Sequence, residues 1–212
     1  MIGESHVVPE YWLRAKRALA RRDPVMAGII RAHPRIGLRS RGDPFLTLAR
    51  SIVGQQISVK AADSVWARLV AAMPAVAPTA VHALDLPRLR ACGLSGRKAE
   101  YLRDLARHFT DGTVHAHRWS EMDDEAVIAE LVQVRGIGRW TAEMFLLFNL
   151  LRPDVLPLAD LGLQRAVASH YFCHDDLAQP AVIQQLAEQW RPWRSVATWY
   201  LWRSLDPVPV EY

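Results

Sequence analysis

The sequence is poor in the features that cross-link a chain or anchor it in a membrane. Its 212 residues include two cysteines, Cys92 and Cys173, so we expect no disulfide framework and a reducing, cytoplasmic compartment. Two thiols also cannot supply the four ligands of an iron–sulfur cluster. Every run of about 18 residues carries charge, and the N-terminus lacks the basic segment and apolar run of a secretory signal. We therefore expect neither a membrane span nor export.

Alternation of apolar and polar residues with a period of two is also scarce, and helical spacing dominates instead. Trp12, Ala15 and Leu19 share one face of a helix predicted over residues 9–22. Further helices are predicted over residues 24–34, 45–53, 58–73, 79–84, 86–92, 95–109, 123–134, 139–150, 161–172, 179–189 and 192–205. The predicted fold class is all-α.

The charge of the chain is mildly basic. It has 26 basic and 22 acidic residues, a net charge of +4 and a pI of about 9.4. Of the basic residues 23 are arginine, whose guanidinium group suits phosphate. This balance is compatible with a polyanionic partner, although the composition of the genome explains the arginine excess equally well.

The stretch over residues 131–164 organises the rest of the chain. It contains a helix end, a tight turn with Gly136 and Gly138, an apolar helix from Arg139, and a loop that leads to Asp160. Glycine at alternate positions indicates a sharp bend that another molecule can approach closely. The first amides of the following helix have no partner inside it, which suits a phosphate. An ordinary interhelix turn, with Asp160 as a helix N-cap, is the alternative.

Three further features favour a functional interpretation. Trp140 and Thr141 follow the turn directly, an apolar face fills residues 142–147, and Leu161 follows Asp160. The order and spacing of hairpin, tryptophan, spacer and aspartate resemble the helix-hairpin-helix superfamily of DNA base-excision glycosylases. Within it, the segment resembles 3-methyladenine DNA glycosylase II and its short relatives. Three further stretches resemble parts of the family. Residues 44–62 resemble its DNA-wedge region, residues 93–105 resemble the helix that follows this region, and residues 190–202 resemble its closing helix.

This resemblance covers roughly residues 43–205 and implies an architecture. We expect a single domain over residues 1–212 with two helical lobes and the active-site cleft between them. Lobe A would comprise about 1–44 and 151–212, and lobe B about 45–150. The larger relative carries an N-terminal β-rich domain, but the residues before the matched region here are predicted to be helical. The resemblance therefore implies a short form without that domain, active as a monomer.

The chemistry implied by the resemblance centres on one carboxylate. Breaking a base–sugar bond builds positive charge on the deoxyribose, which a carboxylate near C1′ stabilises while it positions or deprotonates a water. Asp160 matches the family's catalytic aspartate. In the lyase branch, the position two after the second hairpin glycine is a lysine, whereas here it is Trp140. An indole forms no Schiff base, so a monofunctional enzyme without a catalytic cofactor is predicted.

A base must leave the duplex to be reached, and proteins often fill the gap with a side chain. Gln55, Gln56 and Ile57 match the family's wedge loop. Because Gln56 stands where the larger relative has leucine, Gln56 and Ile57 are both candidates for the wedge itself. The alternative interpretation of this loop is an ordinary polar turn between two helices, with no role in DNA binding.

The hairpin also resembles the family's phosphate grip. Three backbone amides would face a DNA phosphate, those of Gly136, Gly138 and Thr141. Arg135 and Arg139 can add charge. Three backbone carbonyls would hold a monovalent cation, Na⁺ or K⁺, namely those of Val132, Val134 and Ile137. Such contacts position the duplex but read no sequence.

The expected base pocket combines residues from the hairpin and from the end of the chain. Trp202 matches a family tryptophan that stacks on the flipped base. Trp140 is assigned either to the pocket wall or to core packing. Met144 and Leu161 replace pocket aromatics of the larger relative, which predicts a less aromatic pocket. Most of the remaining C-terminal tryptophans are expected in the core, namely Trp190, Trp193 and Trp199.

The predicted function is a monofunctional DNA glycosylase that removes alkylated purines, such as 3-methyladenine and 7-methylguanine, from double-stranded DNA. In a bacterium it would act at the nucleoid. One alternative is a glycosylase of the same superfamily acting on deaminated or mismatched bases. Another is a non-catalytic helix-hairpin-helix module that binds DNA, although Asp160 at the family spacing argues against it.

Overall fold

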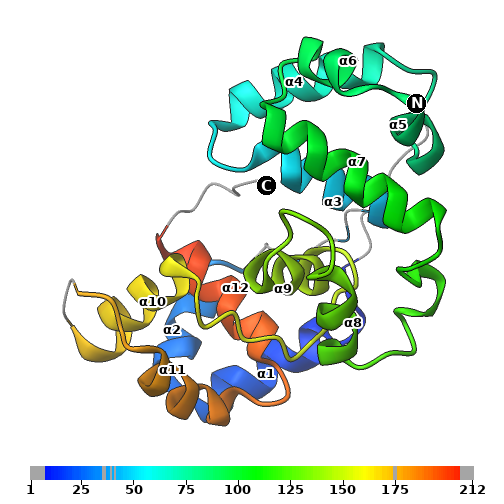
Figure 1. Cartoon of the computed structure of the whole chain (residues 1–212). Helices are drawn as coiled ribbons and strands as arrows, with labels where there is room; N and C mark the ends of the chain where they lie inside the picture. The colour runs from blue at the N-terminus through cyan, green and yellow to red at the C-terminus, as the bar shows by residue number, and fades with distance from the viewer. Residues whose placement is uncertain (1–7, 35–36, 39, 41, 174–175, 206–212) are drawn as a thin grey trace. The chain divides into compact units, whose positions relative to one another are not determined.

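The computed structural model describes residues 8–34, 37–38, 40, 42–173 and 176–205. Throughout this part of the chain the regular secondary structure is helical, without a strand, which confirms the all-α prediction (Figure 1). Among these residues no helix is both long and apolar enough to cross a membrane. The predicted lobe ends at residues 1–7 and 206–212 lie outside the described residues.

The chain divides into two compact units. Unit 1 is Met1–Ser40 with Leu146–Val210, and unit 2 is Arg41–Phe145 with Glu211–Tyr212. The lobe boundaries predicted after residues 44 and 150 lie close to these divisions. That the two units form a single domain with a cleft between them stays a prediction.

Unit 1 is built around its closing helix. It contains α1 (Trp12–Arg22), α2 (Pro24–Ala32), α10 (Leu161–Val167), the π-helical turn η2 (Ala168–Phe172), α11 (Pro180–Leu186), the 3₁₀ turn η3 (Ala187–Trp190) and α12 (Arg194–Leu205). Helix α12 packs against α1, α2 and α10, and most of its side chains are buried (Figure 1). Trp190, Trp193 and Trp199 lie in this core, which confirms their predicted place.

Unit 2 is arranged around α7. It contains α3 (Pro44–Gly54), α4 (Val59–Ala71), α5 (Pro78–Ala83), α6 (Leu86–Ala91), α7 (Gly96–Thr110), the 3₁₀ turn η1 (Ala116–Arg118), α8 (Asp124–Leu131) and the start of α9 (Arg139–Phe148). Helix α7 packs against α3, α5 and α6 (Figure 1). A chain of edge-to-face aromatic contacts runs through the core, from Phe45 to Phe109 to Trp119 to Phe145.

Local sequence signals explain most helix starts. Ser58, the predicted cap of α4, accepts a hydrogen bond from the Ala61 amide at 3.3 Å. Several predicted helix ends are wrong, including that of the helix over 179–189, which is α-helical only to Leu186 and continues as a 3₁₀ turn. The helix predicted over 123–134 ends at Leu131, because residues after it form the hairpin turn. The helix predicted over 161–172 is α-helical only to Val167 and continues as a π-helical turn.

Candidate active site

The hairpin turn joins α8 to α9 within unit 2. The amide of Val134 donates to the carbonyl of Leu131, and the amide of Ile137 donates to the carbonyl of Val134, both at 3.1 Å. Gly136 has a φ of 85°, and a Cβ at this position would collide with the ring of Tyr101. Glycine is therefore required at 136 both by backbone conformation and by space, as the sequence predicted.

Gly138 differs from Gly136. Its backbone lies outside the left-handed region, and an added Cβ would meet no atom of the described chain within 4 Å. The prediction that the turn itself requires glycine is thus wrong at this position. The Gly138 carbonyl accepts from the amide of Ala142 at 3.0 Å, so α9 begins here as expected. The space beside Gly138 leaves the start of the helix open to a molecule outside the chain.

The two arginines of the hairpin are both paired with carboxylates of unit 2. Arg135 donates from its side chain to Glu100 at 3.1 Å. Arg139 donates to Glu125 at 2.9 Å and to Glu143 at 3.1 Å. The guanidinium of Arg139 stabilises the Glu125 carboxylate and lowers its pKa. These pairs offset part of the positive charge that the sequence assigned to the hairpin.

The three carbonyls of the predicted cation site belong to the same turn. Val134 and Ile137 are buried, whereas Val132 is exposed. The Val134 carbonyl accepts one hydrogen bond, and since a carbonyl oxygen has two lone pairs, it retains the capacity to bind an ion. The donor set is all oxygen, which suits a hard monovalent cation. Its presence stays a prediction.

The predicted wedge loop lies directly against the hairpin. The Gln55 side chain donates from Nε2 to the carbonyl of Gly136 at 2.8 Å. Gln56 adopts a left-handed conformation with φ of 58°, and Gln56 and Ile57 are both exposed. Lys98 of α7 donates to the Val53 carbonyl at the end of α3, and burial lowers its pKa. The sequence did not reveal the parts of Lys98 and of Tyr101 in shaping these turns.

The predicted base pocket draws on both units. Trp140 is exposed and Met144 half-buried in the first turns of α9, within unit 2. Leu161, which is exposed, lies with Asp160 and Trp202 in unit 1. The structure brings Asp160 and Trp202 into contact. That they form one pocket with Trp140 and Met144 stays a prediction.

Asp160 occupies the N-cap of α10 and is half-buried. Its Oδ1 atom accepts two hydrogen bonds at 2.7 Å, from the amide of Leu163 and from the indole Nε1–H of Trp202. Its own amide donates to the Pro157 carbonyl at 2.9 Å. The carboxylate is thus fixed in position by its own helix and by α12.

The surroundings of this contact involve two residues that the sequence did not single out. The indole of Trp202 stacks on Phe148, with ring centroids 5.9 Å apart and planes 15° from parallel. At Gly162 a Cβ would lie 3.1 Å from Oδ1 of Asp160 and 3.2 Å from Cδ1 of Trp202. The Leu-Gly-Leu pattern at residues 161–163 gives the one available signal, a glycine inside a predicted helix.

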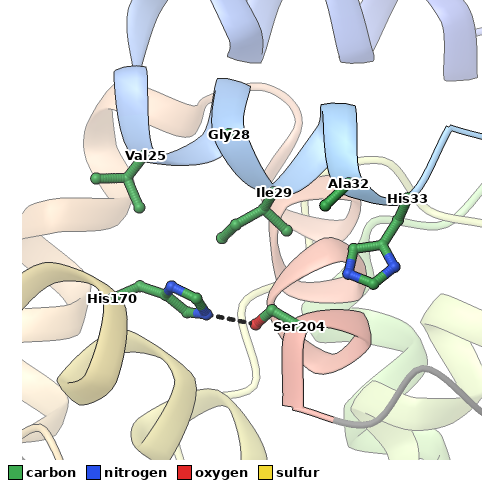
Figure 2. Close-up of a pocket in the computed structure, with 7 residues that line it drawn as sticks. All are labelled: Val25, Gly28, Ile29, Ala32, His33, His170 and Ser204. Carbon is green, nitrogen blue, oxygen red and sulfur yellow. Dashed lines mark hydrogen bonds between the residues drawn. The ribbon is translucent and has the colours of Figure 1, made fainter.

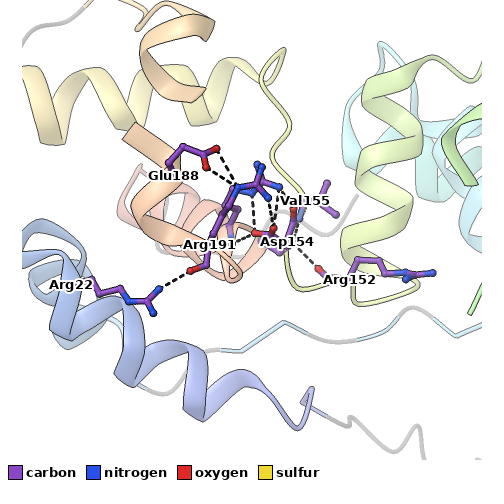
Figure 3. A network of polar contacts seen from close by, with 8 residues as sticks. Arg22, Arg152, Asp154, Val155, Glu188 and Arg191 are labelled. Carbon is purple, nitrogen blue, oxygen red and sulfur yellow. Dashed lines mark hydrogen bonds and ion pairs between the residues drawn. The ribbon is translucent and has the colours of Figure 1, made fainter. Parts of the chain in front are cut away.

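The loop that leads to Asp160 is tied to the start of α12 (Figure 3). Ser195 donates to the Arg152 carbonyl at 2.6 Å and accepts from the amide of Val155 at 2.8 Å. Asp154 accepts from Arg191 at 2.9 Å and from Arg194 at 2.8 Å. The carboxylate of Asp154 is therefore the centre of a polar network and not part of a plain surface turn.

A cavity of about 360 Å³ lies elsewhere in unit 1 (Figure 2). His170 and Ser204 meet across it at 2.7 Å, and burial lowers the pKa of His170. The remaining lining residues are Val25, Gly28, Ile29, Ala32 and His33. None of the predicted site residues lines this cavity, so it is distinct from the predicted base pocket.

The chain belongs to the HhH-GPD superfamily of base excision DNA repair proteins, whose family model matches residues 49–192. It is 40% identical over 129 residues to the putative DNA-3-methyladenine glycosylase YfjP of Bacillus subtilis, covering 61% of this chain and 45% of that protein. It is 32% identical over 168 residues to DNA-3-methyladenine glycosylase 1 of Schizosaccharomyces pombe, covering 76% and 72%. The chain therefore spans less than half the length of the Bacillus relative and about three quarters of the yeast one.

Solved structures of DNA-3-methyladenine glycosylases are also similar to this chain. The Schizosaccharomyces pombe 3-methyladenine DNA glycosylase Mag1, in complex with abasic DNA, is 26% identical with a TM-score of 0.78. The match covers 94% of this chain and 98% of that one. A DNA-3-methyladenine glycosidase from Bacillus halodurans is 28% identical with a TM-score of 0.84, covering 96% and 93%.

Proposed function

We propose that this protein is a monofunctional DNA glycosylase that flips alkylated purines out of double-stranded DNA and hydrolyses their N-glycosidic bond in base excision repair. Its relatives named DNA-3-methyladenine glycosylases support 3-methyladenine as a substrate. We include 7-methylguanine because it is likewise a purine made cationic by alkylation. The observation that carries the proposal is the Asp160 carboxylate, held by two N–H donors at the start of α10.

The carboxylate supplies the electrostatic part of the reaction. As the base departs, positive charge develops on the deoxyribose, and Asp160 stabilises it while it orients or deprotonates the attacking water. Because hydrogen bonds already fix the carboxylate, little reorganisation is needed when that charge appears. A purine alkylated at N3 or N7 is a cation and leaves without a proton from the enzyme.

The hairpin supplies the DNA contact. The open backbone at Gly138, followed by the first amides of α9, suits a phosphate oxygen. In this proposal the carbonyls of Val132, Val134 and Ile137 would hold Na⁺ or K⁺, whose positive charge would favour a phosphate near the turn. The adjacent Gln56 or Ile57 enters the duplex where the base leaves. The protein acts as a monomer in the cytoplasm, at the nucleoid if its source is bacterial.

The proposal is tested by base release from methylated duplex DNA under single-turnover conditions. Wild type should release alkylpurines, and Asp160→Asn should slow release by about 10²–10⁴-fold while DNA binding changes little. Asparagine still caps a helix, so the fold should persist. Asp85 caps α6 through the same bond to the Arg88 amide, which makes Asp85→Asn the matched control with full activity expected. A rate above about a tenth of wild type in Asp160→Asn would remove Asp160 from the catalytic role.

A further inference from the structure

Asp160 is held by contacts that its N-cap role does not explain. An N-cap aspartate needs only the bond from the helix amide, here Leu163. The second donor on the same oxygen comes from Trp202, which lies 42 residues later in the chain. Helix α10 therefore does not set the position of the carboxylate alone, because α12 also holds it.

We propose that Trp202 and Gly162 are positioning residues, which act on the reaction by fixing the orientation of the Asp160 carboxylate. This inference rests on the proposed function of Asp160. It gives Trp202 a role besides the predicted stacking on the flipped base, and it gives Gly162 a role that the sequence did not suggest.

The geometry of Trp202 suits this role. Its indole stacks on Phe148, so one ring face is covered and the plane of the ring is set. The ring edge then carries the Nε1–H group to 2.7 Å from Oδ1 of Asp160. A donor whose direction is fixed by stacking restricts the carboxylate to one orientation. Misplacing a catalytic group by about 1 Å can cost two orders of magnitude in rate.

Gly162 leaves the room that this contact requires. A Cβ at this position would approach both partners of the hydrogen bond, at 3.1 Å from Oδ1 of Asp160 and 3.3 Å from Nε1 of Trp202. Contacts this short force one partner to move by a few tenths of an ångström. The residue is inside a helix, where alanine is otherwise favoured over glycine. Glycine at position 162 therefore allows Asp160 and Trp202 to approach each other closely.

Helix α12 holds the approach loop at its other end as well. Ser195 and Arg194, at the start of the helix, bind the backbone of Arg152 and the side chain of Asp154. Trp202, two turns further on, binds Asp160. Both ends of the loop over residues 152–160 are therefore anchored on one helix, which is consistent with a carboxylate whose position matters.

The first test removes the donor and keeps the ring. Trp202→Phe can still stack on Phe148 but has no N–H group for Asp160. We expect base release to slow by about 10- to 100-fold, as for loss of a hydrogen bond to a charged group, with binding to abasic DNA unchanged. In an Asp160→Asn background the same change should add little, because the two residues act as one unit. Additive losses in the double variant would overturn the positioning role.

The second test separates activity from stability at Gly162. Gly162→Ala should leave the melting temperature unchanged or raise it, because alanine favours the helix, while base release slows at least fivefold. Gly28→Ala in α2 is the matched control, since a Cβ there meets no atom within 4 Å, and both quantities should stay at or above wild type. Full activity of Gly162→Ala would contradict its role.

A third measurement needs no activity. The indole N–H resonance of Trp202, identified by its absence from the Trp202→Phe spectrum, should move and lose protection from solvent exchange in Asp160→Ala. An unchanged resonance would show that the hydrogen bond does not form. If wild type releases no base from any lesion, the proposed function fails. If wild type is active, Asp160→Asn is inactive and both positioning variants are fully active, only the present inference fails.

Discussion

At the scale of single residues, the molecule places one carboxylate in two roles. Asp160 caps α10 by accepting a hydrogen bond from an amide of its first turn, and it is also the group proposed to face the sugar. Capping requires only an acceptor, which asparagine also provides, whereas stabilising a positive sugar requires the charge. The difference between aspartate and asparagine therefore separates the two roles without disturbing the fold. The identity of residue 140 separates two kinds of chemistry in a similar way, because tryptophan permits hydrolysis but not the lyase reaction that a lysine performs.

We predict that the enzyme leaves an intact abasic strand. Trp140 stands at the position where the lyase branch has its attacking lysine, and an indole forms no Schiff base. Borohydride added during turnover should therefore trap no covalent adduct between protein and DNA, and gels should show strand cleavage only after alkali. Trp140→Lys under the same conditions is the informative companion variant. An adduct with wild type would contradict the monofunctional assignment.

At the scale of elements, the two glycines of the hairpin have different roles. Gly136 is required by the fold, because its φ is positive and Tyr101 fills the space beside it. Gly138 has no such requirement within the described chain. The wedge loop is tied to the same turn through Gln55. The hairpin thus combines a part that maintains the turn with a part that is open toward a partner.

This contrast predicts opposite outcomes for two substitutions. Gly136→Ala should lower the free energy of unfolding by at least about 1 kcal/mol, because alanine is strained at positive φ. Gly138→Val should change it by no more than about 1 kcal/mol, yet weaken binding to all duplex sequences alike, since the hairpin contacts backbone. Urea unfolding and fluorescence anisotropy on several duplexes measure both quantities. Unchanged DNA binding with Gly138→Val would favour the ordinary interhelix turn.

The hairpin should also show a defined acid sensitivity. Asp104 accepts from the Arg135 amide at 2.9 Å and from the Arg107 side chain at 2.8 Å. Desolvation by burial raises the pKa of Asp104, but these hydrogen bonds outweigh it and the net pKa is lowered from 3.8. A carboxyl group whose pKa is lower in the folded state stabilises the fold above its unfolded pKa, and this contribution is lost as pH falls through the folded value.

We therefore expect the stability of wild type to fall more steeply below about pH 4 than that of Asp104→Asn, with the difference between them largest near neutral pH. Urea unfolding at a series of pH values from 7 to 3 measures this. Parallel curves for the two proteins would show that Asp104 is not what makes the folded protein sensitive to acid.

At the scale of the whole molecule, the sequence predicted what short-range patterns encode. Helical periodicity gave the all-α class, and proline with capping residues such as Ser58 gave most helix starts. The hairpin, spacer and aspartate pattern located Asp160. The contacts made by Trp202, Gln55 and Asp154 were not predictable, because each joins residues far apart in the chain. No local pattern indicates which distant partner a side chain meets after folding.

The final prediction concerns the choice of substrate. Alkylation at N3 or N7 makes a purine a cationic leaving group that needs no proton, whereas release of a neutral base benefits from a general acid. Relative to their spontaneous rates of loss, 3-methyladenine and 7-methylguanine should therefore be released faster than hypoxanthine or uracil. A panel of duplexes with one defined lesion each, under single-turnover conditions, measures this directly. Release of uracil or of a normal mismatched base, with alkylpurines left in place, would instead support a glycosylase for deaminated or mismatched bases. In that case a proton donor must exist in the part of the pocket that faces the base.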